Sequence, residues 1–553
     1  MSVSKMIISR CDNGKSIYLS WRENGTKSEK LVPFSPYFYV KESAKEPTNY
    51  SVSKITRNYE YVRDGSVNLN KEELKKVVVD CSFDVAQAKK KWKNTYEADV
   101  PLHFRYAVDC IEEMPEYEMR KWYWDMEWQQ GGKYHDCITT IVMYDNYDKK
   151  YYQWVWLPID EELDTQFDTG VRFIFDNEKD MIQSFLLNMV VKDPDMLIAW
   201  FGNRFDLPHL IKRACELGLD PTIMSPIGSV KGLKKTKTGY RFTKAEKGFS
   251  PIEQPIGGRI TLSLDLAFER QWNDSQRGTL PSLSLEYVSQ LLFQEGKVKK
   301  SKFTDKNEFF RRGWLEDTEV YLEYALVDVE LLVRIDETNY CSEAILSLQR
   351  LLKAPFDACF YASHMGSIYF MRNAWWKAPT GDRNVDRKEY DGAMIYDPLS
   401  ENTNGLHLNV AAFDFAQLYP SMMMARNISW ETKSDTETEF GVNISTPRDF
   451  SETKEKNMLY YKTDKLGLLP RAVIELRSLR NEYKKKMKDA KNDNEYIKWN
   501  NNQMAVKRLM ASFYGVLAFQ GFGWADVDLA ASITASAREA IRLAAFKAKE
   551  MKV

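Results

Sequence analysis

Short runs in which apolar and polar residues alternate open the chain and predict β-strands. They lie at residues 6–8, 17–21, 37–40 and 77–79, and Gly, Asn and Pro between them indicate turns. The pattern predicts a small α+β domain over residues 1–112.

Strand-like runs and amphipathic stretches then alternate over residues 113–340. The predicted strands lie at 138–144, 151–157 and 196–200, and the predicted helices at 180–191 and 207–217. This alternation predicts a mixed sheet covered by helices. Residues 225–258 are rich in Gly, Lys and Pro, which predicts a turn-rich excursion with a protruding hairpin.

Two long amphipathic stretches dominate the last part of the chain. Apolar residues recur at three- and four-residue spacing from residue 471, a polar turn follows at 491–494, and a second helix is predicted at 495–513. Two antiparallel helices joined by a polar tip form a hairpin. A further helix is predicted at 531–545, with an exposed apolar face.

The pattern as a whole predicts a multidomain protein of α/β and α+β type, since 553 residues are too many for one domain. The predicted segments are an N-terminal domain (1–112), an α/β domain (113–340), a connector that returns to the N-terminal domain (341–390), a strand-containing part (391–466), a helical hairpin (467–516) and a continuation of that part (517–553).

Composition excludes several classes of protein. Seven scattered cysteines without Cys-x-x-Cys spacing argue against a disulfide framework and a zinc site. No apolar run reaches the roughly 20 residues of a membrane span, and no signal peptide is evident, so we expect a cytoplasmic protein without a membrane partner. The net charge is only −1. Local basic clusters at 89–93, 231–247, 297–302 and 477–488 indicate either nucleic-acid contacts or solvated faces.

The first candidate site is a pair of acids in an aromatic strand. Asp125 and Glu127 alternate with Trp and Tyr residues, so both side chains share one face, with Cα atoms roughly 6.5–7 Å apart. Two acids on one face favour a divalent-metal pair. The alternative is an edge strand with one solvated face.

Two further segments add candidate residues. Asp206 follows an apolar strand and opens a predicted helix, where it is either a site residue or an N-cap. Tyr324 and Asp328 are four residues apart and therefore project from one face of a helix. Taken alone, that pair is also typical of ordinary helix surface.

In this order and spacing, the three segments resemble the ExoI, ExoII and ExoIII motifs of the DEDDy 3′–5′ exonucleases. The resemblance implies an RNase H-like domain in which Asp125, Glu127, Asp206 and Asp328 bind two Mg²⁺ or Mn²⁺ ions. It also implies that Tyr324 orients the attacking water. Only Arg204 separates Asn203 from the aromatic residue, where the family has two or three residues, which puts the role of Asn203 in question.

The last part of the chain carries a second set of candidates. Asp414 ends an apolar run and precedes a helix start, a position that suits a metal-bound triphosphate or a simple helix cap. Arg480 and Lys484 lie one turn apart on the first hairpin helix, and Lys507 lies on the second. Three cations on facing helices suit a triphosphate; the alternative is a solvated face.

These segments, together with residues 392–395, 414–421, 426–429 and 507–515, resemble the family B DNA polymerases of tailed phages. The resemblance implies a palm with a fingers hairpin and two Mg²⁺ or Mn²⁺ ions per active site, with Asp414 as a catalytic metal ligand. It implies that Leu418 and Tyr419 contact the nucleotide and that Tyr419 packs beneath the sugar. Arg480, Lys484 and Lys507 would bind the dNTP. Residues 390–393 resemble the linker that partitions primer ends.

Three departures from the family pattern bear on activity. Ala511 replaces an Asn, and losing one such polar contact costs about 1–3 kcal/mol. Gln417 replaces the usual Ser, which we expect to be mild. No Asp-Thr-Asp sequence follows Gly515, although two metal ions need carboxylates from two strands.

We therefore expect the N-terminal subunit of a split, phage-encoded polymerase with an incomplete palm, acting on primer–template and single-stranded DNA in the cytoplasm of an infected bacterial host. A second polypeptide would supply Asp-Thr-Asp, the remaining palm, the thumb and, through it, contact with a sliding clamp. The alternatives are a stand-alone 3′–5′ exonuclease with a degenerate polymerase half, a nucleic-acid-binding scaffold subunit, and a piece of a longer enzyme.

Overall fold

The computed structural model describes residues 7–11, 13–45, 60–114, 117–129, 131–158, 163–274, 278–296, 301–303, 305–374, 389–394, 408, 414–415, 417–448, 455–519 and 521–551. The chain forms two compact units. The first contains Met1–Phe34 and Cys110–Phe360, and the second contains Ser35–Asp109 and Tyr361–Val553. The segment predicted as one N-terminal domain, residues 1–112, is thus divided between the units.

A seven-stranded mixed sheet forms the centre of the first unit, in the order β10-β11-β9-β8-β7-β12-β15. Its strands are β7 (Lys121–Trp128), β8 (Ile138–Asp145), β9 (Lys150–Trp156), β10 (Gln166–Phe167), β11 (Gly170–Phe175), β12 (Met196–Ala199) and β15 (Ile260–Ser263). Strand β7 pairs antiparallel with β8 and parallel with β12. The predicted mixed sheet is confirmed.

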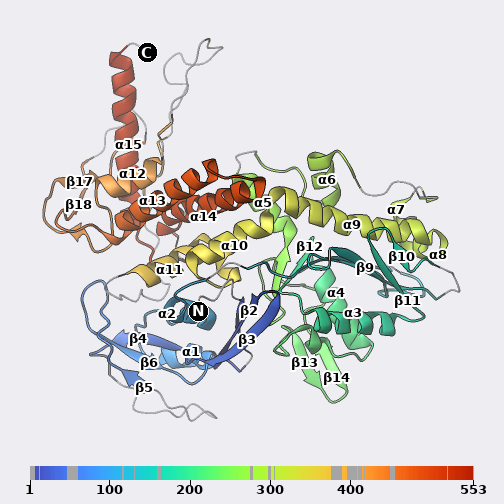
Figure 1. The fold of residues 1–553 in the computed structure, drawn as a ribbon. Coiled ribbons are helices and arrows are strands. Elements are labelled where there is room, and N and C mark those ends of the chain that lie inside the picture. Colours follow the sequence, from blue (N-terminus) through green and yellow to red (C-terminus); the bar gives the residue numbers. More distant parts are fainter. Residues whose placement is uncertain are drawn as a thin grey trace. The chain divides into compact units, whose positions relative to one another are not determined.

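Helices cover both faces of this sheet (Figure 1). Trp122 and Trp124 of β7 pack on Phe185 of α3 (Glu178–Lys192). Tyr123, between them, donates a hydrogen bond to Asp336 of α9 (Thr318–Asn339), at 2.7 Å. Successive β7 side chains therefore alternate between α3 and α9, and Asp125 and Glu127 lie on the α9 face.

The remaining elements of the first unit surround this sheet. The helices are α4 (Asp206–Glu216), α5 (Leu264–Asp274), α6 (Leu285–Phe293), α7 (Lys306–Glu308), α8 (Trp314–Glu316) and α10 (Cys341–Leu352). The tight turns are two 3₁₀ turns, Pro221–Met224 and Phe356–Phe360, and a π-helical turn, Phe309–Gly313. Strands β13 (Leu233–Thr236) and β14 (Gly239–Phe242) form the hairpin predicted within 225–258.

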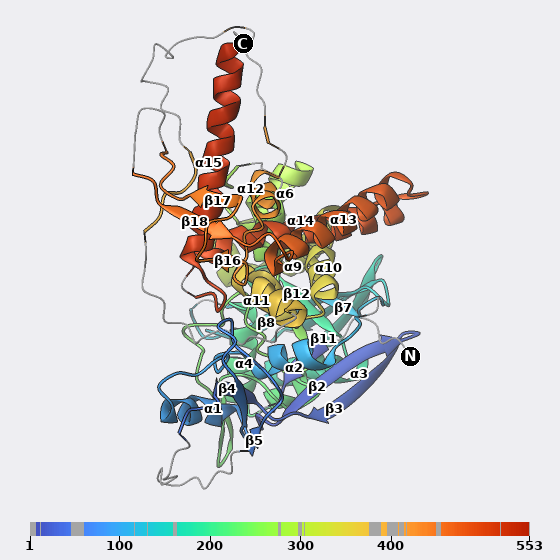
Figure 2. The ribbon, with the colours of Figure 1, turned by 90° about the vertical axis from the view of Figure 1, so that its left-hand side faces the viewer.

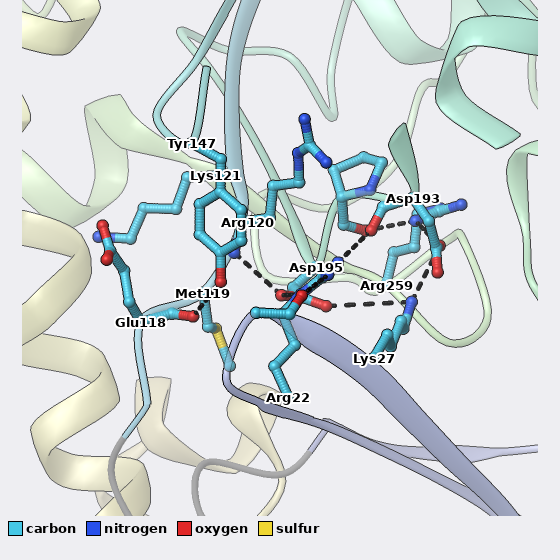
Figure 3. Close-up of polar contacts among 12 residues, drawn as sticks. Arg22, Lys27, Glu118, Met119, Arg120, Lys121, Tyr147, Asp193, Asp195 and Arg259 are labelled. Atoms are coloured by element: carbon cyan, nitrogen blue, oxygen red, sulfur yellow. Dashed lines mark hydrogen bonds and ion pairs between the residues drawn. The ribbon is translucent and has the colours of Figure 1, made fainter. Parts of the chain in front are cut away.

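A three-stranded meander, β1 (Ile7–Arg10), β2 (Ser16–Glu23) and β3 (Thr26–Pro33), belongs to the same unit. Figure 3 shows the ion pairs that connect it to the rest of the unit: Arg22 and Lys27 contact acidic residues between α3 and β12. Arg22 pairs with Asp195, which is fully buried, and Lys27 lies 2.9 Å from Asp193. These ion pairs link β2 and β3 to the segment between α3 and β12.

The second unit combines two small sheets with helices. One sheet has the order β4 (Tyr37–Lys41), β6 (Leu74–Val78), β5 (Glu60–Val62), and the other β16 (Lys433–Ser434), β18 (Met458–Tyr461), β17 (Phe440–Asn443). The helices are α1 (Ser82–Ala88), α2 (Leu102–Cys110), α11 (Ala362–Asn373), α12 (Leu418–Ala425), α13 (Leu468–Lys488), α14 (Asp493–Leu517) and α15 (Val527–Glu550), with a 3₁₀ turn at Lys89–Lys91.

Helices α13 and α14 lie side by side and confirm the predicted helical hairpin (Figure 2). Within the predicted helix at 531–545, the first half is buried and only the end exposes apolar side chains. Leu543 is 59% exposed, and Phe546, one residue beyond the predicted range, is 58% exposed. The apolar run that Asp414 ends falls on 408–413, of which 409–413 lie outside the described residues.

Candidate functional site

Three carboxylates from two elements meet on the α9 face of the sheet. Asp125 and Glu127 of β7 and Asp328 of α9 each offer an oxygen, and these oxygens lie within 4.8 Å of one another. Asp328 is 3% exposed, and the other two are half-buried. In the part of the chain that the structure describes, no other group of three His, Cys, Asp or Glu side chains is placed to hold an ion.

Asp206 joins this cluster electrostatically. It is the first residue of α4, whose N-cap is Phe205, and it is 4% exposed. Burial raises the pKa of the Asp206 carboxyl well above its usual range, and the charge of Asp125 raises it further, followed by Glu127 and Asp328. Carboxylates that repel one another in this way fit a divalent ion, because its charge relieves the repulsion.

Tyr324 lies one turn before Asp328 on α9 and is 5% exposed. The rings of Phe309 and Phe310 pack edge-on against it, with centroids 5.7 and 5.5 Å away. Tyr324 and Asp328 are therefore buried together, in contrast to the alternative of ordinary helix surface.

Asn203 has a different surrounding from the acids. Its side-chain amide donates hydrogen bonds to the carbonyls of Ser250, Pro251 and Glu253, at 3.2, 3.1 and 2.8 Å. These hydrogen bonds hold the turn that follows Gly248. A Cβ added at Gly248 would lie 2.4 Å from the Arg204 carbonyl oxygen. Asn203 serves the local fold, a role that the sequence pattern did not indicate.

The candidates of the second unit surround the start of α12 and the hairpin. Asp414 is exposed and precedes α12, on which Leu418 and Tyr419 are half-buried. The Tyr419 ring packs on Tyr514 of α14, with centroids 4.3 Å apart. The aromatic pair gives Tyr419 a fixed position beside the hairpin.

Lys484 is close enough to Arg480 and Lys507 for their charges to disfavour its own. The charge of Arg480 is the main cause that lowers the pKa of the Lys484 ammonium, followed by burial and by Lys488 and Lys507. Arg480 also donates a hydrogen bond to Gln503 of α14, at 3.2 Å. Clustered cations favour an anion such as a polyphosphate. Ala511, one turn after Lys507, is exposed and offers no polar side-chain atom.

The molecule thus combines an acidic cluster suited to divalent ions with a cationic hairpin suited to phosphates, groups that serve metal-dependent chemistry on phosphate esters. Residues 367–551 match DNA polymerase family B, and residues 159–251 match the exonuclease domain of that family. Two regions of the chain thus match the polymerase and exonuclease domains of family B DNA polymerases.

Known DNA polymerases align over most of the chain. A DNA polymerase of Pyrococcus glycovorans is 27% identical over 98% of this chain and 67% of its own length. One of Thermococcus sp. (strain 9oN-7) is 26% identical over 96% of this chain and 66% of its length, and the DNA polymerase delta catalytic subunit of Candida albicans is 25% identical over 67% of this chain and 35% of its length. The chain thus spans about two thirds of the archaeal relatives and about a third of the fungal one.

A solved structure supports the same fold. The family B DNA polymerase of Pyrobaculum calidifontis superimposes with a TM-score of 0.70 at 18% identity, over 100% of this chain and 72% of that one. These relatives are archaeal and eukaryotic, so the resemblance to tailed-phage enzymes stays a prediction. Among the described residues, no helix is long and apolar enough to cross a membrane.

Proposed function

We propose that the first unit is a 3′–5′ DNA exonuclease whose catalytic domain corresponds to residues 113–340. The carboxylate cluster of Asp125, Glu127 and Asp328, with Asp206 beside it, is the observation that carries the proposal. These four residues would hold two Mg²⁺ or Mn²⁺ ions. When bound, such ions stabilise the attacking and leaving oxygens of a phosphodiester.

The residues of the chain then have distinct tasks in this reaction. The four carboxylates bind the ions and set the distance between them. The Asp206 and Asp328 carboxylates are buried and therefore shielded from bulk water. The Tyr324 hydroxyl orients the attacking water, and the rings of Phe309 and Phe310 limit the movement of its side chain. Single-stranded DNA with a free 3′ end is the expected substrate.

For the second unit we propose the nucleotide site of a template-directed polymerase, with a palm at 391–466 and 517–553 and fingers at 467–516. Asp414 would be a metal ligand, Leu418 and Tyr419 would contact the dNTP, and Arg480, Lys484 and Lys507 would bind its triphosphate. The effect of the Arg480 and Lys507 charges on Lys484 supports the proposal, because it indicates that these cations are clustered. Primer–template DNA would be the substrate.

The polymerase reaction also needs a second strand that carries metal-binding carboxylates. The sequence contains no Asp-Thr-Asp to supply them. If the enzyme is split, a second polypeptide supplies this strand, the thumb and the contact with a sliding clamp. The alternative is that a further segment of the same polypeptide supplies them. A stand-alone exonuclease whose polymerase half only binds DNA is the second candidate function, favoured by Ala511 in place of the family Asn.

One experiment separates these functions. The chain is incubated with Mg²⁺ and a labelled primer–template, with and without dNTPs. We expect shortening of the primer without dNTPs and no extension with them, followed by extension when a polypeptide carrying Asp-Thr-Asp is added. Extension by the chain alone would contradict the need for a second carboxylate strand, and an unshortened primer would contradict the exonuclease.

A further inference from the structure

The side chain of Tyr324 packs against a π-helical turn. Phe309 and Phe310, whose rings flank Tyr324, both belong to the π-helical turn Phe309–Gly313. Such turns are rare and recur at functional sites. Gly313 allows the turn to close, because an added Cβ would lie 2.9 Å from the ring of Phe309.

A buried glutamine holds this turn. Gln129 follows β7, two residues after Glu127, and is 3% exposed. Its side-chain Nε2 donates a hydrogen bond to the carbonyl oxygen of Phe310, at 3.1 Å. The backbone of Gln129 is itself fixed, since its N–H donates to the Cys137 carbonyl and its carbonyl accepts from the Asp136 N–H.

A second link joins the same two segments. The hydroxyl of Tyr321, fully buried on α9, lies 3.0 Å from Thr139 Oγ1, which donates a hydrogen bond to the Glu127 carbonyl at 3.1 Å. Helix α9, which carries Tyr324 and Asp328, is thus tied to the backbone of the strand that carries Asp125 and Glu127. Gln129 extends this connection to the aromatic rings around Tyr324.

We propose that Gln129 and Phe310 are positioning residues of the exonuclease site. Gln129 fixes the Phe310 carbonyl, the Phe310 ring confines the Tyr324 side chain, and the Tyr324 hydroxyl is thereby held at one distance from the carboxylates. Burying an amide costs free energy unless it is hydrogen-bonded, and the bond to the Phe310 carbonyl supplies a partner for the buried amide of Gln129. The inference rests on the proposed exonuclease function.

A double-mutant cycle tests this proposal. Single-turnover degradation of single-stranded DNA at saturating Mg²⁺ is measured for Gln129→Met, Phe310→Leu, Tyr324→Phe and the double variant Gln129→Met/Tyr324→Phe. We expect Gln129→Met and Phe310→Leu to lower the chemical rate about 10- to 100-fold with unchanged DNA affinity, because small misplacements of catalytic groups are costly. The double variant should be no slower than Tyr324→Phe alone.

Gln153→Met is the matched control. Gln153 is fully buried and, like Gln129, donates its amide to a backbone carbonyl, that of Leu322 on α9 at 3.0 Å. It also accepts a hydrogen bond from Nε of the buried Arg172, at 3.0 Å. Gln153→Met should lower the thermal midpoint at least as much as Gln129→Met, because it also removes the acceptor of Arg172. The Gln153→Met protein should nevertheless degrade DNA faster than the Gln129→Met protein. Phe310→Leu gives an independent reading if Gln129→Met does not fold.

The outcomes separate the inference from the function on which it rests. A wild-type rate in Gln129→Met and Phe310→Leu, or rate losses that multiply in the double variant, would overturn the positioning role. A wild-type rate in Tyr324→Phe would overturn both that role and the assignment of Tyr324. Undiminished degradation after replacement of Asp125 and Glu127 would instead overturn the exonuclease site itself.

Discussion

The pKa of the buried Asp206 carboxyl group is raised mainly by burial and, next in size, by the charge of Asp125. The two residues lie on different elements, α4 and β7, and a divalent ion is the natural way to relieve their repulsion. This relationship connects the stability of the metal-free protein with the function of the site.

Replacing Asp206 by Asn should stabilise the metal-free protein at neutral pH. A raised folded-state pKa contributes stability below the unfolded carboxyl value of about 3.9, and this contribution is lost as the pH rises through the folded pKa. Asn does not titrate, so the thermal midpoints of the two proteins should be closest below pH ~4 and diverge toward neutral pH. Scanning calorimetry in EDTA gives both midpoints. A lower midpoint for Asp206→Asn at pH 7 would contradict the electrostatic account.

Divalent ions should stabilise the wild-type protein. Binding to the folded state adds about 2.7 kcal/mol at roughly 100 times the Kd. Thermal midpoints measured during a Mn²⁺ titration should rise for the wild type and remain constant for Asp125→Ala/Glu127→Ala. Asp168→Ala, which removes an exposed carboxylate of the same unit, is the control and should respond like the wild type. An equal rise in all three proteins would place the ion elsewhere.

The hairpin cations should determine dNTP affinity. Lys484→Ala and Lys507→Ala should each weaken dNTP binding, since each removes a positive charge from the cluster around Arg480. Lys485→Ala, an exposed neighbour on α13, should have little effect. Ala511→Asn should strengthen binding by about 1–3 kcal/mol, because it adds one polar contact. Equilibrium binding of a labelled dNTP with Ca²⁺ measures all four. Equal affinities throughout would remove the basis for a triphosphate site.

The fully buried Asp195 should be essential for the stability of the first unit. It pairs with Arg22, accepts the Arg120 backbone N–H at 2.9 Å, and lies near Lys27 (Figure 3). Breaking a buried pair by removing one partner costs about 3–5 kcal/mol. Asp195→Asn should therefore lower the urea midpoint of this unit strongly, whereas Asp168→Ala should not. A wild-type midpoint would show that the meander is held by other contacts.

Local periodicity was sufficient for much of the fold. The common face of Asp125 and Glu127 follows from strand alternation, and the α13–α14 hairpin follows from its apolar spacing, so both were predictable. Strand β3 was not, because residues 26–33 lack clear alternation. The grouping of residues 1–34 with 110–360 could not be predicted from local patterns either, since it involves ion pairs between residues about 170 positions apart.

The candidate site was also only partly predictable from the sequence. The acids and Tyr324 could be proposed from motif order, while their burial and the repulsion around Asp206 needed the structure. Gln129 and Phe310 gave no sequence signal, because a π-helical turn has no pattern of its own and a single Gln after a strand is unremarkable in sequence. The role of Asn203 was likewise set by a turn about 50 residues away.

The central claim is that the four carboxylates form the exonuclease site. It is tested most directly by degradation of 3′-labelled single-stranded DNA with Mg²⁺, comparing the wild type, Asp125→Ala/Glu127→Ala and Asp168→Ala, with DNA binding measured in EDTA. The account predicts that only the double variant loses degradation while all three bind DNA alike. Undiminished degradation by the double variant would contradict it.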